Sequence, residues 1–371
     1  MEFTVSKAGL LKELELAESV VEKKTTIPIL ANILLDDQGG KLLLSATDLE
    51  LALRSECEFQ PLTAGATTVP GKRLVEIVRS LADAQIRIKV LENHWIEITC
   101  ERSFFKLAGM SKENFPALPE APKAQAEFPA AALSSLITRT SFAIANEESR
   151  YTLNGALMVL KPDKIMMVAT DGHRLAQVER ETPVEGLNNE LRVLIPKKAM
   201  AEIYKVLEHS DAEEKVKFAK DENHLFFNVG SRLLTSRVLT GQFPNYDAVL
   251  PRDNNRIIIL DRADFTNAIK RVALMADPRT RAIRLQMENG KMEIFSVSSE
   301  QGEAHQALDA EYEGEKMQIG FNYQYLLDFL GALEGETKVR LELKDEQSAG
   351  QLRPVNEERF RYRYVVMPMR V

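Results

Sequence analysis

Two side chains in the stretch Ala169-Thr-Asp-Gly-His-Arg-Leu-Ala176 have the types and the spacing of a catalytic pair. The Asp171 carboxylate could orient the His173 imidazole, and the ring could then take a proton from a nucleophile, as in a hydrolase. The two residues flank a glycine at a turn, however, and no third orienting group is evident. Turn chemistry with a surface imidazole is therefore the favoured interpretation.

The rest of the sequence offers no other site for metal, phosphate or covalent chemistry. None of the five histidines has metal-ligand spacing with another His, Cys or carboxylate. There is no glycine-rich phosphate loop and no Gly-x-Ser-x-Gly elbow. Cys57 and Cys100 are too few for a disulfide framework or a zinc cluster. We therefore predict no catalytic residue, no metal, no cofactor and a reducing, cytoplasmic location.

The stretch around Asp171 is better described as a β-hairpin. Residues 165–169 form a short apolar run typical of a strand, Asp171-Gly172 is a two-residue turn signal, and in/out alternation resumes over residues 175–179. A related stretch, Ala46-Thr-Asp-Leu-Glu-Leu-Ala-Leu53, occurs upstream. This second copy indicates that the hairpin belongs to a repeated unit.

The repeated unit occurs three times along the chain. Each third begins with an amphipathic helix, continues with strands and a second helix, and closes with alternating strands. The first helices are expected to begin near Val5, Phe128 and Leu260. The second helices are expected just after Val69-Pro70, Ile195-Pro196 and Ile319-Gly320, at an interval of roughly 125 residues. The early strands are expected at residues 33–35 and 41–45, 155–160 and 165–169, and 283–287 and 291–297. The closing strands are expected at 86–90 and 95–107, 216–219 and 224–238, and 339–343 and 360–367.

Proline-containing segments separate the three units. Residues 114–119 end the first repeat and residues 242–251 end the second, and proline interrupts strand pairing. The landmarks keep the same order and nearly the same spacing, which argues against chance similarity. We predict an α+β protein of three repeated domains, each with two helices packed on antiparallel sheets, at residues 1–122, 123–251 and 252–371.

The overall charge does not suggest nucleic-acid binding, but the charges on single helices do. The net charge is −7, and each third of the chain is slightly acidic. On a helical wheel, Lys197, Lys198 and Lys205 share one side, and apolar residues cover the other. The first repeat shows the same pattern with Lys72, Arg73 and Arg79, whereas the third repeat has Gln324 and Asp328 at these positions instead. The alternatives are a solvated helix surface or a basic stripe that contacts phosphates without reading sequence.

The segment Val365-Val-Met-Pro-Met-Arg370 is apolar in a region where polar residues are the norm. Pro368 should end a strand and leave Met367 and Met369 outside the hydrogen-bond ladder. The segment is either a core strand or an adaptable surface that accommodates several apolar partners. No apolar run approaches the roughly eighteen residues of a membrane span, and residues 1–5 lack the form of a signal peptide.

These residues resemble the bacterial DNA sliding clamps, the beta subunits of DNA polymerase III, along the whole chain. The matching motifs are Met1-Glu-Phe-Thr-Val5, Ile27-Pro-Ile-Leu30, Ala66-Thr-Thr-Val-Pro70, Arg150-Tyr151, Leu153-Asn-Gly155, Ala169-Thr-Asp-Gly-His-Arg-Leu175, Phe243-Pro244 and Tyr364-Val-Val-Met-Pro-Met-Arg370. The resemblance implies a non-catalytic processivity factor: a head-to-tail homodimeric ring, with twelve helices lining its hole, that encircles double-stranded DNA without sequence specificity. It also implies a clamp loader, the replicative polymerase and repair proteins as partners, and no role at a membrane.

In this family, partners dock a short extended peptide into a groove between the second and third domains. Carried over motif by motif, the groove would consist of Leu153, Thr170, Gly172, His173, Arg174, Leu175, Pro244, Val249, Val365, Met367, Pro368, Met369 and Arg370. The other two hairpin copies differ, with Leu49-Glu50 in place of Gly-His in the first. One groove per subunit is therefore expected.

The resemblance also implies DNA contacts and a dimer interface. The DNA contacts would come from Lys24, Arg73, Arg79, Arg150, Tyr151, Lys197, Lys198 and Lys205. Ring closure would pair an edge strand at residues 102–107 with one at residues 295–306. The interface residues would be Arg102, Phe104, Phe105, Lys106, Leu107, Leu274, Met275, Glu300 and Glu303.

Three functions therefore compete at the level of sequence: a DNA-encircling scaffold, a hydrolase that uses Asp171 and His173, and a peptide-binding hub with no DNA role. Salt-dependent retention on circular but not on linear DNA, without turnover of any substrate, is expected only of the scaffold.

Overall fold

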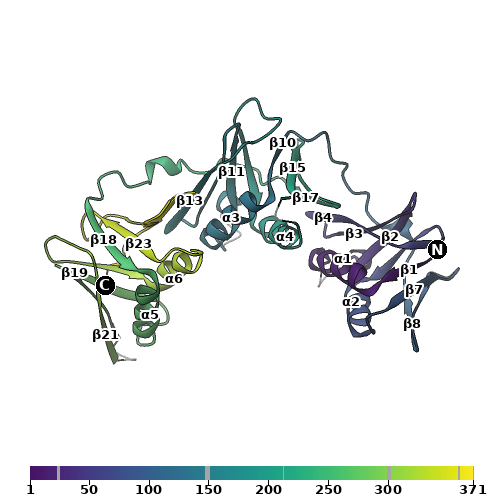
Figure 1. Cartoon of the computed structure of the whole chain (residues 1–371), viewed down its shortest axis with the longest axis horizontal. Coiled ribbons are helices and arrows are strands. Elements are labelled where there is room, and N and C mark those ends of the chain that lie inside the picture. The colour runs from purple at the N-terminus through teal and green to yellow at the C-terminus, as the bar shows by residue number, and fades with distance from the viewer. Residues whose placement is uncertain (23–25, 147–150, 212, 299–301, 358–359, 371) are drawn as a thin grey trace. The chain divides into compact units, whose positions relative to one another are not determined.

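The computed structural model describes residues 1–22, 26–146, 151–211, 213–298, 302–357 and 360–370. The chain divides into two compact units. Figure 1 labels their helices and strands. The first unit comprises Met1–Ser134, Glu185–Leu187 and Lys198–Val238. The second comprises Ser135–Val184, Asn188–Lys197 and Leu239–Val371. The middle repeat thus contributes to both units, and its helices α3 (Ala130–Thr140) and α4 (Lys197–Glu208) each have residues in both.

The first unit contains two antiparallel sheets and the helices α1 (Lys7–Val20) and α2 (Gly71–Ser80), which contact each other. The strand order of the larger sheet is β10-β15-β16-β17-β4-β3-β2-β6. Its strands are β2 (Asn32–Gln38), β3 (Lys41–Thr47), β4 (Leu51–Cys57), β6 (Ala66–Pro70), β10 (Ala126–Pro129), β15 (Lys215–Lys220), β16 (His224–Val229) and β17 (Arg232–Arg237). The smaller sheet, of order β5-β1-β7-β8-β9, consists of β1 (Glu2–Ser6), β5 (Gln60–Thr63), β7 (Gln85–Val90), β8 (Trp95–Cys100) and β9 (Ser103–Ala108). Short 3₁₀ turns are η1 (Pro28–Ala31) and η2 (Lys112–Asn114).

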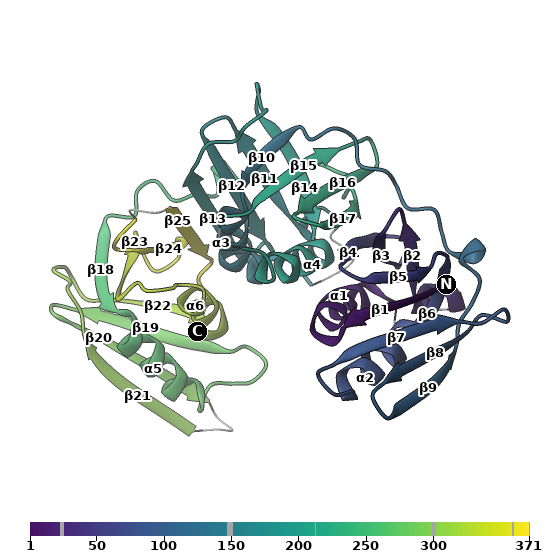
Figure 2. The same cartoon turned by 45° about the vertical axis from the view of Figure 1, so that its right-hand side comes forward.

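The second unit has the same plan, with the helices α5 (Arg262–Ala273) and α6 (Tyr323–Gly331) in mutual contact (Figure 2). The strand order of its larger sheet is β14-β11-β12-β13-β25-β24-β23-β18. The strands are β11 (Gly155–Lys161), β12 (Lys164–Thr170), β13 (Arg174–Glu181), β14 (Leu191–Pro196), β18 (Arg256–Asp261), β23 (Lys338–Leu343), β24 (Gly350–Pro354) and β25 (Arg361–Val366). The smaller sheet, of order β21-β20-β19-β22, consists of β19 (Ala282–Glu288), β20 (Lys291–Ser298), β21 (Gly302–Asp309) and β22 (Met317–Asn322). Its 3₁₀ turns are η3 (Ser141–Ala143), η4 (Tyr151–Leu153) and η5 (Tyr246–Ala248).

Each large sheet is shared by two repeats. In the first unit β4 pairs with β17, and in the second β13 pairs with β25. A buried ion pair supports the first junction, since the Arg232 guanidinium donates to both carboxylate oxygens of Glu13, at 2.6 and 2.9 Å. Removing one partner of such a buried pair costs about 3–5 kcal/mol.

Local sequence sets where the helices start. The side chains of Ser6 and Asp261 each accept a hydrogen bond from the backbone N–H three residues on, and Asn322 accepts one from Gln324. These caps satisfy amides that a helix leaves unpaired at its first turn. The predicted starts of the six helices are confirmed to within a few residues. No helix among the described residues is long and apolar enough to cross a membrane.

Several sequence-based expectations about strands were wrong. The run at residues 295–306 is not one edge strand, because Phe295 lies on β20, which pairs with a neighbour on both sides. The edge is β21 alone. The expected runs at residues 95–107 and 224–238 are each two strands, β8 with β9 and β16 with β17. Eight further strands, none longer than six residues, were not predicted: β1, β5, β6, β10, β14, β18, β22 and β24.

Candidate partner-binding pocket

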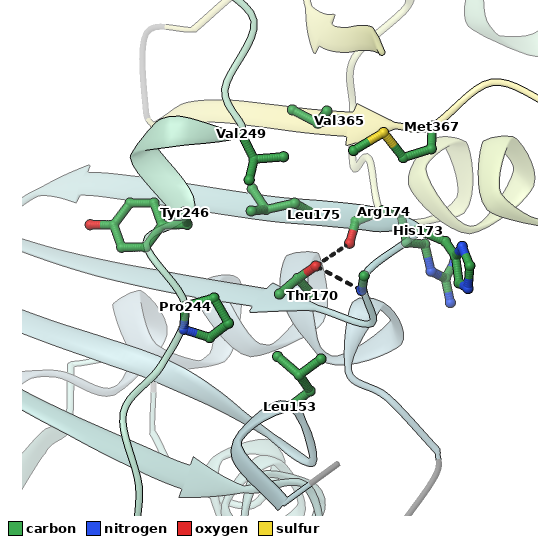
Figure 3. Close-up of a pocket in the computed structure, with 11 residues that line it drawn as sticks. Leu153, Thr170, His173, Arg174, Leu175, Pro244, Tyr246, Val249, Val365 and Met367 are labelled. Atoms are coloured by element: carbon green, nitrogen blue, oxygen red, sulfur yellow. Dashed lines mark hydrogen bonds between the residues drawn. The ribbon is translucent and has the colours of Figure 1, made fainter. Parts of the chain in front are cut away.

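A pocket of about 150 Å³ opens in the second unit, beside the turn that joins β12 to β13. It is lined by Leu153, Thr170, Gly172, His173, Arg174, Leu175, Pro244, Tyr246, Val249, Val365 and Met367 (Figure 3). Four separate segments contribute: η4, the turn, the linker around η5, and β25 with the residue that follows it. Most of the lining is apolar, so the pocket suits an apolar side chain.

The turn is held by its own side chains. The Thr170 hydroxyl donates to the Arg174 carbonyl at 2.6 Å and accepts from the Gly172 N–H at 3.1 Å (Figure 3). Asp171 Oδ1 accepts from the N–H groups of His173 and Arg174, at 2.9 and 3.0 Å. Thr170 pairs with Leu175, so the tip is Gly172-His173, one residue later than the predicted Asp-Gly tip. Gly172 has a φ of +89°, which favours glycine at this position.

The Asp171 carboxylate is therefore a structural group of the turn. Its second oxygen accepts from Arg174 Nε at 3.0 Å, while the exposed His173 contributes its N–H to the first. No group of His, Cys, Asp and Glu side chains within the described ranges could hold a metal ion. The contacts of Asp171 support turn chemistry rather than a catalytic pair with His173.

The segment after β25 forms one side of the pocket. Met367 N–H donates to the His173 carbonyl at 2.9 Å, which ties the segment to the turn. Met369 then forms an isolated bridge with Gly320, its N–H donating at 2.8 Å. The expectation that both methionines lie outside the ladder thus holds for Met367 but not for Met369.

Ten of the thirteen residues expected in the groove line the pocket. Pro368, Met369 and Arg370 do not, because the bridge to Gly320 carries the chain onto β22. Tyr246 was not expected, yet it lines the pocket and packs with Phe243 of the same linker, at 6.4 Å between ring centroids. The available signal was a second aromatic residue in the linker that already supplies Pro244 and Val249.

Comparisons with known proteins agree with this geometry. Family models described as the N-terminal, central and C-terminal domains of the DNA polymerase III beta subunit match residues 1–119, 127–245 and 247–370. Together they span almost the whole chain. The chain belongs to the DNA polymerase III beta subunit family.

Members of this sliding-clamp family resemble the chain over its full length. The beta sliding clamps of Pseudomonas putida and Escherichia coli are 37% and 34% identical, with complete coverage of both sequences in each case. The crystal structure of the Pseudomonas aeruginosa sliding clamp bound to griselimycin superposes with a TM-score of 0.94, at 35% identity and full coverage of both chains. Three α+β clamp domains and a non-catalytic, processivity-clamp function follow from this membership.

In this chain, the described basic residues that were expected to contact DNA already form hydrogen bonds or ion pairs within the protein. The three lysines of α4, hereafter the α4 lysines, bind Asn146 (Lys197), Asp48 (Lys198) and Glu202 (Lys205). Arg73 pairs with Glu76 at 2.9 Å and Arg79 with Glu15 at 2.8 Å. The two arginine pairs are exposed on both sides, and such pairs contribute only about 0–1 kcal/mol, so phosphates could displace these two carboxylates. Lys24, Arg150 and the Tyr151 side chain lie outside the described residues.

The expected dimer residues form two exposed apolar patches. On the edge strand β9, the Phe104 side chain is 59% exposed, and Phe105 and Leu107 are half-buried. Just after α5, Leu274 is 79% exposed and Met275 37%. The charged members Arg102, Lys106 and Glu303 are exposed as well, and Glu300 lies outside the described residues.

Proposed function

We propose that the chain tethers replication and repair proteins to duplex DNA, and that the pocket beside the Asp171 turn receives a short extended peptide from each partner. The observation that carries this proposal is the convergence of the turn, the linker and the segment after β25 on one apolar pocket. A peptide would place one or two large apolar side chains there and leave its polar residues at the rim.

Pocket size sets the expected strength of binding. Burial of one Leu or Phe side chain contributes roughly 1.5–3 kcal/mol. One or two anchors with a few backbone hydrogen bonds should give dissociation constants near the micromolar range, about −8 kcal/mol. Such peptides act by tethering, because linkage to a DNA-bound partner raises the effective concentration.

The test of the pocket is calorimetry with a Gln- and Leu-rich apolar pentapeptide against the wild type and a deletion of residues 367–371. The deletion removes Met367 and its hydrogen bond to the turn, so binding should be lost. Equal affinity for both proteins would mean that the segment after β25 is ordinary structure and that the pocket has another purpose.

We further propose that two copies close head to tail into a ring. Edge strands carry unpaired N–H and C=O groups that invite pairing, and β9 and β21 are edges of their sheets. The charges are complementary, with Arg102 and Lys106 near β9 and Glu303 on β21. A solution mass of twice 41.8 kDa is the expected result; a monomer at micromolar concentration would contradict ring closure.

Contact with DNA is proposed to be electrostatic and independent of sequence, through the α4 lysines, Arg73 and Arg79, with Lys24, Arg150 and Tyr151 as further candidates. A clamp loader, which must open the ring, and a cytoplasmic location belong to the same proposal, as do domain boundaries after residues 122 and 251. Retention on circular but not linear DNA tests the encircling role. A hub without a DNA role would show no salt-dependent retention on either.

A further inference from the structure

The charged end of Arg174 is held by several contacts within the protein. Its guanidinium contacts the Asp171 carboxylate, the Asp328 carboxylate of α6 and the Phe142 carbonyl of η3. It also stacks on the Tyr325 ring, 4.3 Å from the centroid. The side chain is only 10% exposed. Each of its three guanidinium nitrogens therefore already donates to a group within the protein.

Charged neighbours stabilise this arrangement. Burial by itself would lower the pKa of Arg174, but the surrounding Tyr364 hydroxyl and the two carboxylates raise it overall. Asp328 is fixed from its other side by Gln324 Nε2, which donates to Oδ1 at 2.8 Å. A chain of contacts thus runs from Asp171 through Arg174 and Asp328 to Gln324, one turn earlier on α6.

The first repeat contains the same turn, connected to the next repeat in a different way. The Thr47 hydroxyl donates to the Leu51 carbonyl at 2.7 Å and accepts from the Leu49 N–H at 3.0 Å. Asp48 Oδ1 accepts from the N–H groups of Glu50 and Leu51. Leu51 occupies the position of Arg174. A cation is still present, because Lys198 pairs with Asp48. Both turns therefore neutralise their aspartate: the first with a lysine from the middle repeat, and the second with its own arginine, which also reaches Asp328 of the third repeat.

We propose that Arg174 and Asp328 are positioning residues for the pocket: they fix the turn that lines it, and their charged groups do not contact the peptide. The inference rests on the proposed peptide-binding function and refines it. Figure 3 shows the backbone carbonyl of Arg174 bonded to Thr170 on the pocket side. The pocket's shape accordingly depends on Asp328, a carboxylate on α6.

This role explains an oddity of the sequence. In the second helices of the first two repeats, the side opposite the apolar face is basic, whereas α6 has Gln324 and Asp328 there. Asp328 is 21% exposed and bonded to both Gln324 and Arg174, so it is not a free surface acid. A basic residue at position 328 would repel the Arg174 guanidinium and release the turn.

The experiment is a double-mutant cycle read out by peptide calorimetry. The variants are Asp328→Asn, which keeps the shape and loses the charge, Arg174→Gln, and the two combined. An uncharged, end-blocked apolar pentapeptide is the probe, so no ionic contact with Arg174 can contribute. Each single variant should weaken binding about tenfold, and the double variant should be no weaker than the worse single one, since residues of one network are not additive.

Control variants separate positioning from general damage to the fold. Glu357→Gln breaks a comparable half-buried pair with Arg353, at 2.6 Å in the same unit, and should leave peptide affinity unchanged. Asp328→Glu, which restores the charge, should recover part of the affinity lost in Asp328→Asn. Near-ultraviolet circular dichroism at the calorimetry temperature checks that each variant is folded.

Each outcome decides a different question. If the wild type does not bind the peptide, the proposed function fails. If the wild type binds, the deletion of residues 367–371 does not, and Asp328→Asn binds as tightly as the wild type, the positioning role alone is overturned. Additive losses from Arg174→Gln and Asp328→Asn would also overturn it, because they would mean that Arg174 contacts the peptide directly.

Discussion

Replacing Thr170 with valine tests how far the pocket depends on a single hydroxyl. Valine keeps the shape of the side chain but leaves the Arg174 carbonyl and the Gly172 N–H without the hydrogen bonds of 2.6 and 3.1 Å. Each of these hydrogen bonds is worth about 1 kcal/mol, so the ordered turn should be destabilised by about 2 kcal/mol. Because 1.4 kcal/mol is a factor of ten, local opening should increase by roughly ten- to thirtyfold.

Hydrogen exchange measures this opening directly. Exchange of the amides at residues 171–174 should be faster by that factor, while exchange in the neighbouring strands is unchanged. Peptide affinity should fall roughly tenfold, since the peptide must then order the turn as it binds.

The chain provides a matched control in Thr47→Val. Thr47 makes the same two hydrogen bonds, at 2.7 and 3.0 Å, in the turn of the first repeat, where no pocket residue lies. Its turn should open equally, with no effect on peptide binding. The reasoning is refuted if Thr170→Val binds the peptide as well as the wild type, or if Thr47→Val weakens binding as much.

Three further predictions concern other surfaces. Alanine at both exposed residues after α5, Leu274 and Met275, should yield monomers at micromolar concentration in sedimentation, because the apolar contact outweighs the exposed ion pairs; an intact dimer would place the interface elsewhere. Neutralising the α4 lysines should weaken DNA retention equally for all sequences. The slope of log affinity against log salt concentration should become shallower by roughly 0.9 for each phosphate that is no longer neutralised. An unchanged slope would mean that these lysines do not contact DNA. Burial, followed by nearby carboxylates, raises the pKa of Cys57 from 9.0 to about 12, and Cys100 is buried as well. A thiol reagent at pH 8 should therefore react with neither cysteine in the folded protein and with both in denaturant, and rapid native labelling would contradict this burial.

Local features of the fold were predictable from the sequence. The six helices and the hairpin at Asp171 follow from periodicity, caps and turn residues, all of which act within a few positions. The tip of that hairpin was misplaced by one residue, because Asp171 uses its side chain to organise the turn and leaves the tip to Gly172-His173.

Features that depend on distant partners were not predictable from patterns alone. The pairing of β13 with β25 brings Leu175 beside Val365, and no local signal specifies that register. The same limit applies to Met369, whose bridge to Gly320 withdraws it from the pocket. Asp328 looked like a surface acid on a helical wheel, since a wheel shows one helix and not the arginine that meets it.

The pairing of β13 with β25 also has a consequence for the order of assembly. The pocket takes Leu153 from one repeat and Met367 from the next, so its walls lie roughly two hundred residues apart in sequence, and contacts over such distances form late. A chain in which the third repeat is unfolded or damaged has the turn but only one wall. Such a chain cannot recruit a partner through this pocket, and recruitment therefore reports that the second unit has finished folding.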